Sequence, residues 1–305
     1  MSNRKWALLY SGFIVPFFLF SCKTEEGFIP SYIQIDSIGV NASTIFGNNL
    51  EDFQAVQVYQ NGQTVGTFPI PCTFPVDGEG KTKLNIVPFI KNNGNSNTLI
   101  PYRTIQPLDI EVDLKREQTT IAYPVFSFRP NTKVVWQEDF ESGNSTLVPL
   151  RMNYGDTVSV KRDSFSLLGR YFNNNNQFHN TFIFENDSLK SIDLAIFDRI
   201  KFLPADGREV FVEFDVKSDV PVTLALKRFT PDRTQVGKFI ESYVPYMTAN
   251  PTKGQWKRFY SNLIYEIQGQ PANTEYLILF SFDKPAEYSG DLNVKIDNIR
   301  VTYLE

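Results

Sequence analysis

Four aromatic residues in the last third of the chain are the strongest candidates for binding chemistry. They are Tyr243, Tyr246, Trp256 and Tyr260, and Tyr265 follows a few residues later. The flat C–H face of a sugar ring lies well on an aromatic plane, and polar neighbours can then recognise its hydroxyl groups. These residues therefore suggest a sugar-stacking surface. The alternative, which the sequence favours, is that Trp256 packs in a core and the tyrosines line the edge of a sandwich.

Residues that enzymes commonly use for catalysis are scarce. His179 is the only histidine, which excludes a metal site of several histidines and leaves one imidazole base at most. It follows the asparagine run at 173–176, and we expect it in a surface loop. The Gly-x-Ser-x-Gly, phosphate-loop and Gly-x-Gly-x-x-Gly motifs are missing. A glycoside hydrolase needs only two carboxylates, but nothing selects a pair among the 34 acidic residues. The chain is therefore predicted to be no enzyme and to hold no cofactor.

Size and charge limit the class of protein. The chain of 305 residues is long enough for two domains, and its 42% hydrophobic and 21% charged residues are typical of globular proteins. The net charge is −4. Because nucleic-acid binding needs a basic face, we exclude nucleic acid as a partner.

The N-terminal segment predicts export and lipid attachment. Arg4 and Lys5 precede fourteen uncharged residues at 7–20. This run is too short for a membrane-spanning helix, which needs roughly 20 apolar residues. It ends in LFSC, which resembles the lipobox of bacterial lipoproteins. The resemblance implies that residues 1–21 are a signal peptide and that the Cys22 thiol carries acyl chains, which would anchor the protein firmly.

The segment that follows Cys22 suggests where the anchor would lie. The sequence KTEE at 23–26 looks like the export signal that directs Bacteroidota lipoproteins to the outer face of the outer membrane; a solvated tether is the alternative. Residues 27–38 are similar to the opening of a group of uncharacterised Bacteroidota surface lipoproteins. The resemblance implies an outer-membrane protein that faces the cell exterior, with residues 22–30 as its lipidated tether.

Residues 31–128 are predicted to form an immunoglobulin-like β-sandwich, because about seven short strands fit into about 100 residues. Asn61-Gly62 lies between two strand-like runs, which is the strongest short signal for a β-hairpin. Cys72 lies in an apolar, strand-like stretch and is expected to act as a small buried hydrophobe. Asp109, Glu111 and Asp113 share one face of a strand. We expect this to be the solvated outer face, and cation binding is the alternative.

Residues 133–305 are predicted to form a second, jelly-roll β-sandwich after a linker at 129–132. Alternating apolar residues at 210–216 indicate a strand with one face inward. Residues 276–282 are nearly all apolar, as in a central strand buried on both faces. The apolar positions slip by one residue near the C-terminus, which predicts a β-bulge at Asp297-Asn298.

Three motifs of the second domain resemble jelly-roll modules that are often found in carbohydrate-binding proteins. They are WQEDFE at 136–141, GQWKRFY at 254–260 and KIDNIRV at 295–301. In such modules, carboxylates of the first and last strands can hold a structural calcium ion, which takes six to eight oxygen ligands. The resemblance implies that Asp139, Glu141 and Asp297 are the candidates for this site.

Three functions are compatible with these features. The first, which we predict, is a non-catalytic accessory or assembly subunit beside outer-membrane proteins, because two sandwiches offer broad docking faces. The alternative is a glycan-binding module of a nutrient-uptake system, and the third is a hydrolase. The fold alone does not decide. Glycan binding predicts exposed aromatics on one sheet face, a subunit predicts a contiguous apolar patch, and a hydrolase predicts two carboxylates in one cleft.

Overall fold

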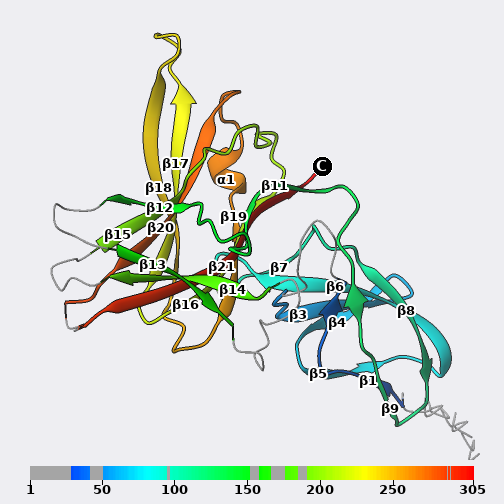
Figure 1. Ribbon diagram of the computed structural model, residues 1–305. Helices are drawn as coiled ribbons and strands as arrows, with labels where there is room; N and C mark the ends of the chain where they lie inside the picture. Colours follow the sequence, from blue (N-terminus) through cyan, green and yellow to red (C-terminus); the bar gives the residue numbers. More distant parts are fainter. Residues whose placement is uncertain are drawn as a thin grey trace, which may run out of the picture.

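The computed structural model describes residues 29–41, 51–94, 97–151, 158–165, 176–184, 191–286, 288 and 290–305. The chain is almost entirely β-structure, with one helical turn, α1 (Ile264–Ile267). Two sandwiches lie against each other (Figure 1). The prediction of an immunoglobulin-like sandwich followed by a jelly-roll sandwich is confirmed. Cys22 lies outside the described residues, within which no helix is both long and apolar enough to cross a bilayer.

The first sandwich uses the first ten strands. A three-stranded sheet, in the order β5-β1-β9, packs against a five-stranded sheet of β4-β3-β6-β7 in which β8 also pairs with β6, while β2 and β10 pair with each other. These strands are β1 (Ser31–Ile35), β2 (Gly39–Val40), β3 (Ala55–Gln60), β4 (Gln63–Pro69), β5 (Cys72–Val76), β6 (Gly80–Lys91), β7 (Leu99–Pro101), β8 (Leu108–Leu114), β9 (Thr119–Ile121) and β10 (Val125–Phe126). Fully buried Ile33, Phe74 and Ile86 lie in the core between the sheets.

The predicted hairpin and the solvated face of β8 are confirmed in this sandwich, whereas Cys72 is less buried than expected. Asn61 and Gly62 join β3 to β4, and both have positive φ, 51° and 79°, as a tight hairpin turn requires. Cys72 is half-buried against the core, and burial raises the pKa of its thiol. The three acidic side chains of β8 point to solvent, where Glu111 pairs with Lys81 at 3.2 Å.

The second sandwich is built from two larger sheets. One has the order β13-β14-β21-β16-β19 with β11 paired to β21, and the other has the order β12-β15-β20-β17-β18. The strands are β11 (Thr132–Glu138), β12 (Leu147–Arg151), β13 (Val158–Ser164), β14 (Phe178–Phe184), β15 (Ser191–Ile196), β16 (Val210–Ser218), β17 (Val222–Pro231), β18 (Phe239–Ala249), β19 (Lys257–Asn262), β20 (Glu275–Asp283) and β21 (Leu292–Leu304). We call the first the six-stranded sheet and the second the five-stranded sheet. From here on, the name five-stranded sheet refers only to the sheet of the second sandwich.

The predicted bulge lies in β21. Against β16, Glu213 pairs with Arg300 but Asp215 pairs with Asp297, so β21 carries one extra residue between these pairs. Asn298 lies in this stretch with a φ of 49°. The extra residue lets Val294 and Ile296 before it, and Ile299 and Val301 after it, all face the same core.

The first sandwich covers part of the outer face of the six-stranded sheet. Phe211 of β16 and Tyr260 of β19 belong to the core of the first sandwich, and Asn92 forms a β-bridge with Tyr260. The predicted alternation along β16 is present, but the polar side is not solvated: Glu213 and Asp215 are completely buried. Two sandwiches that share a core at their junction are expected to behave as one body.

Candidate functional site

A network of buried charges fills the junction between the sandwiches. Arg300 donates from Nε to Glu213 at 2.6 Å and from Nη2 to Glu51, a residue of the first sandwich. Arg258 donates to Glu213 at 3.1 Å and to Asp215 at 3.0 Å. All five side chains are excluded from water. Because buried charges are stable only when they are paired, the network fixes how the two sandwiches dock.

The two carboxyl groups at the end of this network have raised pKa values. Burial raises the pKa of Asp215 to about 6, although Arg258 and Asn298 oppose the shift. Burial and the neighbouring Asp215 hold the pKa of Asp297 well above its usual range. Asn298 Nδ2 bridges the two, donating to Asp215 at 2.9 Å and to Asp297 at 2.8 Å. Neither carboxyl is exposed, so this pair cannot meet a substrate.

The outer face of the five-stranded sheet is different, because it combines small apolar residues with polar ones. Side chains of β15, β17 and β20 alternate between the core and this face. Ala195, Leu279 and Ala225 lie directly opposite one another on these three strands and form a small apolar cluster outside the main core. This cluster makes a smooth floor across the middle of the sheet.

Tyr243 lies across this floor. It belongs to β18 at the edge of the sheet, and its hydroxyl shares a hydrogen bond of 3.3 Å with Ser281 Oγ on β20. Because β17 separates these strands, the phenol must run along the sheet over β17, where Ala225 leaves room for it. The side chain is nevertheless 45% exposed. One face of the ring is therefore presented to solvent over an apolar floor.

A row of polar side chains borders the ring. Asp193, Ser281, Thr223 and Thr248 face one another on four neighbouring strands. Ser281 Oγ donates to Asp193 Oδ1 at 2.5 Å, and the two threonine hydroxyls lie 3.0 Å apart. The hydroxyl of Tyr243 is thus the first member of a hydrogen-bonded chain that ends on a carboxylate. An aromatic ring face beside hydroxyl and carboxylate groups can bind a polyhydroxylated ligand.

Charged residues close the other end of this face. Arg199 places its guanidinium 3.6 Å from the centre of the Phe229 ring and bonds Glu275 at 3.0 Å. Burial raises the pKa of Glu275, but hydrogen bonds from Arg199 and Lys201 outweigh this effect and hold the pKa below its usual range. Beside the ring of Tyr243, Lys227 pairs with Glu241 at 2.7 Å. The face therefore offers both acceptors and donors around the aromatic ring.

The structure does not bring the other predicted aromatic residues to this face. Tyr246 is half-buried at the junction, where its hydroxyl donates to Asn93 Oδ1 at 3.4 Å. Tyr260 is buried, and its hydroxyl donates to Glu51 at 2.6 Å. Tyr265 is 81% exposed on α1. Of the candidate residues, Tyr243 alone combines an exposed ring with polar neighbours on a sheet.

Two expectations, for Trp256 and His179, are wrong. Trp256 is not part of the core of the sandwich; its ring centre lies 5.0 Å from that of His179, in an edge-on contact, and 5.1 Å from that of Phe165, in a tilted contact. His179 is not in a surface loop, because β14 begins at Phe178 and places it in the sheet, where it is buried. Burial and the charge of Lys295 lower the pKa of His179 to about 4, so it is neutral at neutral pH.

The candidate calcium ligands are used for other bonds. Asp139 Oδ1 accepts the N–H of Glu141, and Glu141 Oε1 accepts the N–H groups of Gln177 and Phe178. Asp297 is bonded to Asn298. Within the described ranges, no three histidine, cysteine or acidic side chains converge as metal ligands. The calcium site stays a prediction.

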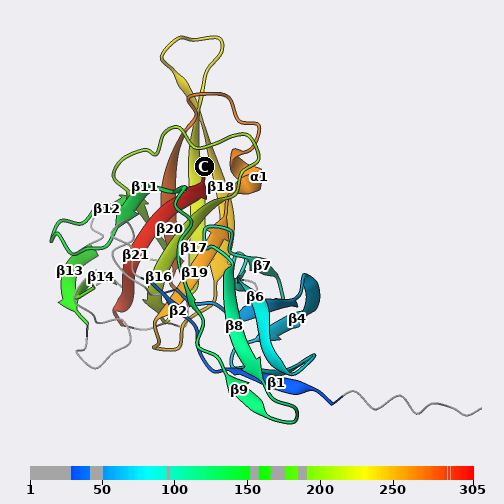
Figure 2. The ribbon, with the colours of Figure 1, turned by 90° about the vertical axis from the view of Figure 1, so that its right-hand side faces the viewer.

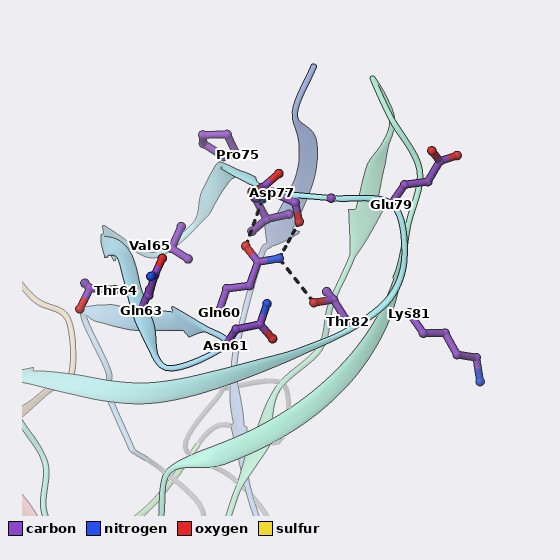
Figure 3. Close-up of a pocket in the computed structure, with 12 residues that line it drawn as sticks. Gln60, Asn61, Gln63, Thr64, Val65, Pro75, Asp77, Glu79, Lys81 and Thr82 are labelled. Carbon is purple, nitrogen blue, oxygen red and sulfur yellow. Dashed lines mark hydrogen bonds between the residues drawn. The ribbon is translucent and has the colours of Figure 1, made fainter. Parts of the chain in front are cut away.

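A hollow of about 450 Å³ lies in the first sandwich, between the β3–β4 hairpin and the β5–β6 turn (Figure 3). Its central Gln60 is bonded to the backbone of Asp77 in both directions and donates to Thr82. Figure 3 shows Glu79 and Lys81 pointing away from this amide. The described residues around the hollow include no aromatic ring. The amide therefore serves to hold the turn.

Sequence reasoning missed the polar residues beside Tyr243. Asp193 and Ser281 each interrupt an apolar strand, in SIDLAI and in YLILFSF. A polar residue within a strand that is otherwise buried on both faces is a usable signal, because such a residue needs a partner. Which strand supplies the partner depends on the order of strands in the sheet.

Comparison with known proteins gives no family. No family model matches the chain, and no curated protein matches it. Solved structures that it resembles include a CBM22-2 xylan-binding domain of Paenibacillus barcinonensis Xyn10C, with a TM-score of 0.36 and 16% identity over 55% of this chain and 99% of that one. Another is TmCBM61 in complex with β-1,4-galactotriose, with a TM-score of 0.28 and 19% identity over 55% of this chain and 94% of that one. Since both TM-scores are below 0.5, the ligands of those modules say nothing about the ligand of this chain.

Proposed function

We propose that this chain is a lipid-anchored, non-catalytic glycan-binding protein of the outer membrane that faces the cell exterior. Its binding surface is the outer face of the five-stranded sheet around Tyr243. A sugar ring stacks on the open face of the phenol, and its hydroxyl groups meet the accessible end of the polar row, at Thr223 and Thr248. The anchor is the acylated Cys22. We therefore propose glycan binding, the alternative function in the sequence analysis, in place of the accessory-subunit function that the sequence predicts.

One observation carries the glycan proposal: the side chain of Tyr243, 45% exposed, is held on the outer face of the sheet by the hydrogen bond between its hydroxyl and Ser281. A ring that is already held in place loses little conformational entropy on binding, so stacking contributes its full free energy. The neighbouring Ser281–Asp193 bond is buried, and it holds Ser281 in position to bond the hydroxyl of Tyr243.

Tyr243→Ala is expected to weaken glycan binding about tenfold, equal to about 1.4 kcal/mol, because it removes the stacking plane. The measurement is affinity gel electrophoresis of the purified protein in gels that contain soluble xylan, galactan, glucan or mannan. A polysaccharide that retards the protein is then titrated by calorimetry. Tyr243→Phe keeps the plane and loses only the hydroxyl bond, so it should retain more of the affinity.

Tyr265→Ala is the matched control, since this tyrosine is exposed but lies on α1. The Tyr265→Ala protein should bind the polysaccharide with the same affinity as the parent protein. If Tyr243→Ala binds as tightly as the parent, the binding face has been placed wrongly. Failure of every polysaccharide to retard the parent, together with recovery of a stoichiometric outer-membrane protein, would favour the accessory subunit.

Cys22→Ser tests the anchor. The parent protein should be recovered almost entirely with membranes, because each buried acyl CH₂ group stabilises the bound state by roughly 0.8 kcal/mol. The variant should be recovered in the soluble fraction after cell disruption. Mass spectrometry of the mature N-terminus provides the direct measurement, and an unmodified Cys22 in the parent would refute the anchor.

A further inference from the structure

The outer-face residues of β1, β5 and β9 in the first sandwich are uncharged, and the exposed carboxylate of Asp36, directly after β1, accepts a hydrogen bond from Gln34 at their border. Tyr32, Gln34, Thr119 and Ile121 lie on this face of β1 and β9, because they pair with one another and alternate with buried residues. Thr73 and Pro75 of β5 lie opposite the β1 residues, and Tyr123 and Val125 continue the row beyond β9. We call these eight residues, Tyr32, Gln34, Thr73, Pro75, Thr119, Ile121, Tyr123 and Val125, the uncharged face.

The uncharged face exposes unusually large apolar side chains. Tyr123 is 68% exposed and Ile121 is 50% exposed, and Tyr32 and Val125 are also exposed. The other side of the same sandwich is the opposite in character, because β6 and β8 present Lys81, Glu111 and further charged residues to solvent. A sheet face with large apolar residues and without charge is expected to be covered by a partner.

The position of this face indicates the partner. The described chain begins at Ile29, directly before β1, and Cys22 is seven residues earlier. An extended chain spans at most about 3.5 Å per residue, so the acylated cysteine lies within about 25 Å of Ile29 and within about 32 Å of Ser31, where β1 begins. In both ribbon views β1 and β9 lie at the opposite end of the protein from the β17–β18 hairpin (Figures 1 and 2).

We propose that the uncharged face lies on the surface of the bilayer that holds the anchor. This inference rests on the lipid anchor proposed above, but not on glycan binding. Tyr32 and Tyr123 place their rings at the level of the lipid headgroups, where amphipathic tyrosine side chains are most stable. Ile121 and Val125 reach the boundary of the acyl chains, while the carboxylate of Asp36 at the border of the face stays hydrated at the level of the headgroups. The second sandwich then points away from the membrane, and Tyr243 is accessible from outside the cell.

The experiment places a fluorescent reporter in the face of the full, acylated protein. After removal of the signal peptide the chain keeps two tryptophans, Trp136 and Trp256, and both lie in the second sandwich. Tyr123→Trp adds a third on the uncharged face, and Tyr265→Trp adds one on α1 as the matched control. Each protein is bound to vesicles of phosphatidylethanolamine and phosphatidylglycerol, with and without brominated acyl chains, which quench nearby tryptophans.

The added fluorescence of Tyr123→Trp is expected to be quenched about twofold more strongly than that of Tyr265→Trp. Introducing Ile121→Asp into the Tyr123→Trp protein should abolish the difference, because a charge opposes contact with the acyl boundary. Ile121 is half-exposed, and circular dichroism checks that the variant folds.

The outcomes separate this inference from the anchor. If the parent protein does not sediment with the vesicles, the anchor itself has failed. Sedimentation with equal quenching at both positions would keep the anchor and refute the docking of this face. Blue-shifted emission of the Tyr123→Trp protein without quenching by brominated lipid would show that another protein, or a second copy, covers the face, and would also overturn the proposal.

Discussion

Replacement of Arg300 by methionine is expected to lower the free energy of unfolding by about 3–5 kcal/mol, because it leaves buried carboxylates without their cation. Arg300 bonds both Glu51 and Glu213, and all three side chains are excluded from water. After the substitution, Arg258 alone faces Glu51, Glu213 and Asp215. Denaturant unfolding followed by circular dichroism measures the loss.

The same substitution should also change the cooperativity of unfolding. Glu51 belongs to the first sandwich and Arg300 to the second, so the parent protein is expected to unfold in one calorimetric transition. The Arg300→Met protein should show two transitions, since the shared junction is weakened while each sandwich keeps its own core.

Arg116→Met is the matched control for Arg300→Met. Arg116 forms an ion pair with Glu79 at 3.2 Å, but both side chains are exposed. Such pairs contribute little, and the control should change stability by less than about 0.5 kcal/mol. A double-mutant cycle with Glu51→Gln isolates the contribution of the Glu51–Arg300 pair. A coupling close to zero would mean that the network does not hold the sandwiches together.

Asp215→Asn is expected to stabilise the protein at neutral pH and to make its stability less dependent on pH. The carboxyl groups of Glu51, Glu213 and Asp215 face only two guanidinium groups, of Arg258 and Arg300. The asparagine removes the surplus charge. Its side-chain oxygen can still accept the bonds that Arg258 and Asn298 now donate to Asp215.

The sign of the pH effect follows from the direction of the pKa shift. The pKa of Asp215 is raised from 3.8 to about 6 in the folded protein, so folding favours its protonated form. Its stabilising contribution is complete below pH 3.8 and is lost as the pH rises through about 6. The pKa of Glu51 is lowered although burial raises it, because Arg300 and Arg258 favour its charged form. The contribution of Glu51 is therefore lost in the opposite direction, as the pH falls below its ordinary value of 4.5.

These opposite directions define the window for the measurement. Between pH 4.5 and 6.5 the stability of Asp215→Asn relative to the parent should increase by about 2 kcal/mol, which is 1.4 kcal/mol for each pKa unit crossed. The raised pKa of Asp297 acts in the same direction in both proteins. Asp113→Asn, a change on the exposed side of β8, provides the control and should follow the parent. A constant difference across the window would mean that Asp215 keeps its ordinary ionisation.

The candidate site could be found only in part from the sequence. Tyr243 was selected as an aromatic residue in a strand-like segment, and it does lie on an outer sheet face. Asp193 and Ser281 were missed, because residues 276–282 resemble a strand buried on both faces. Asp193 and Ser281 face each other only because β15 lies next to β20, and the two residues are 88 positions apart in the sequence. Local alternation carries no information about such a pairing.

The sequence by itself determined the elements of this protein, because their causes are local. Alternating apolar residues define the strands, Asn61-Gly62 forms its turn through two positive φ angles, and the slipped pattern near Asn298 requires the bulge. Only the tertiary structure decided which outer faces are solvated. The alternation that exposes Glu111 on β8 also places Glu213 on the outer side of β16, yet the first sandwich buries Glu213 with two arginines. Burial there depends on the docking of one sandwich on another, which is a long-range event that no window of sequence encodes.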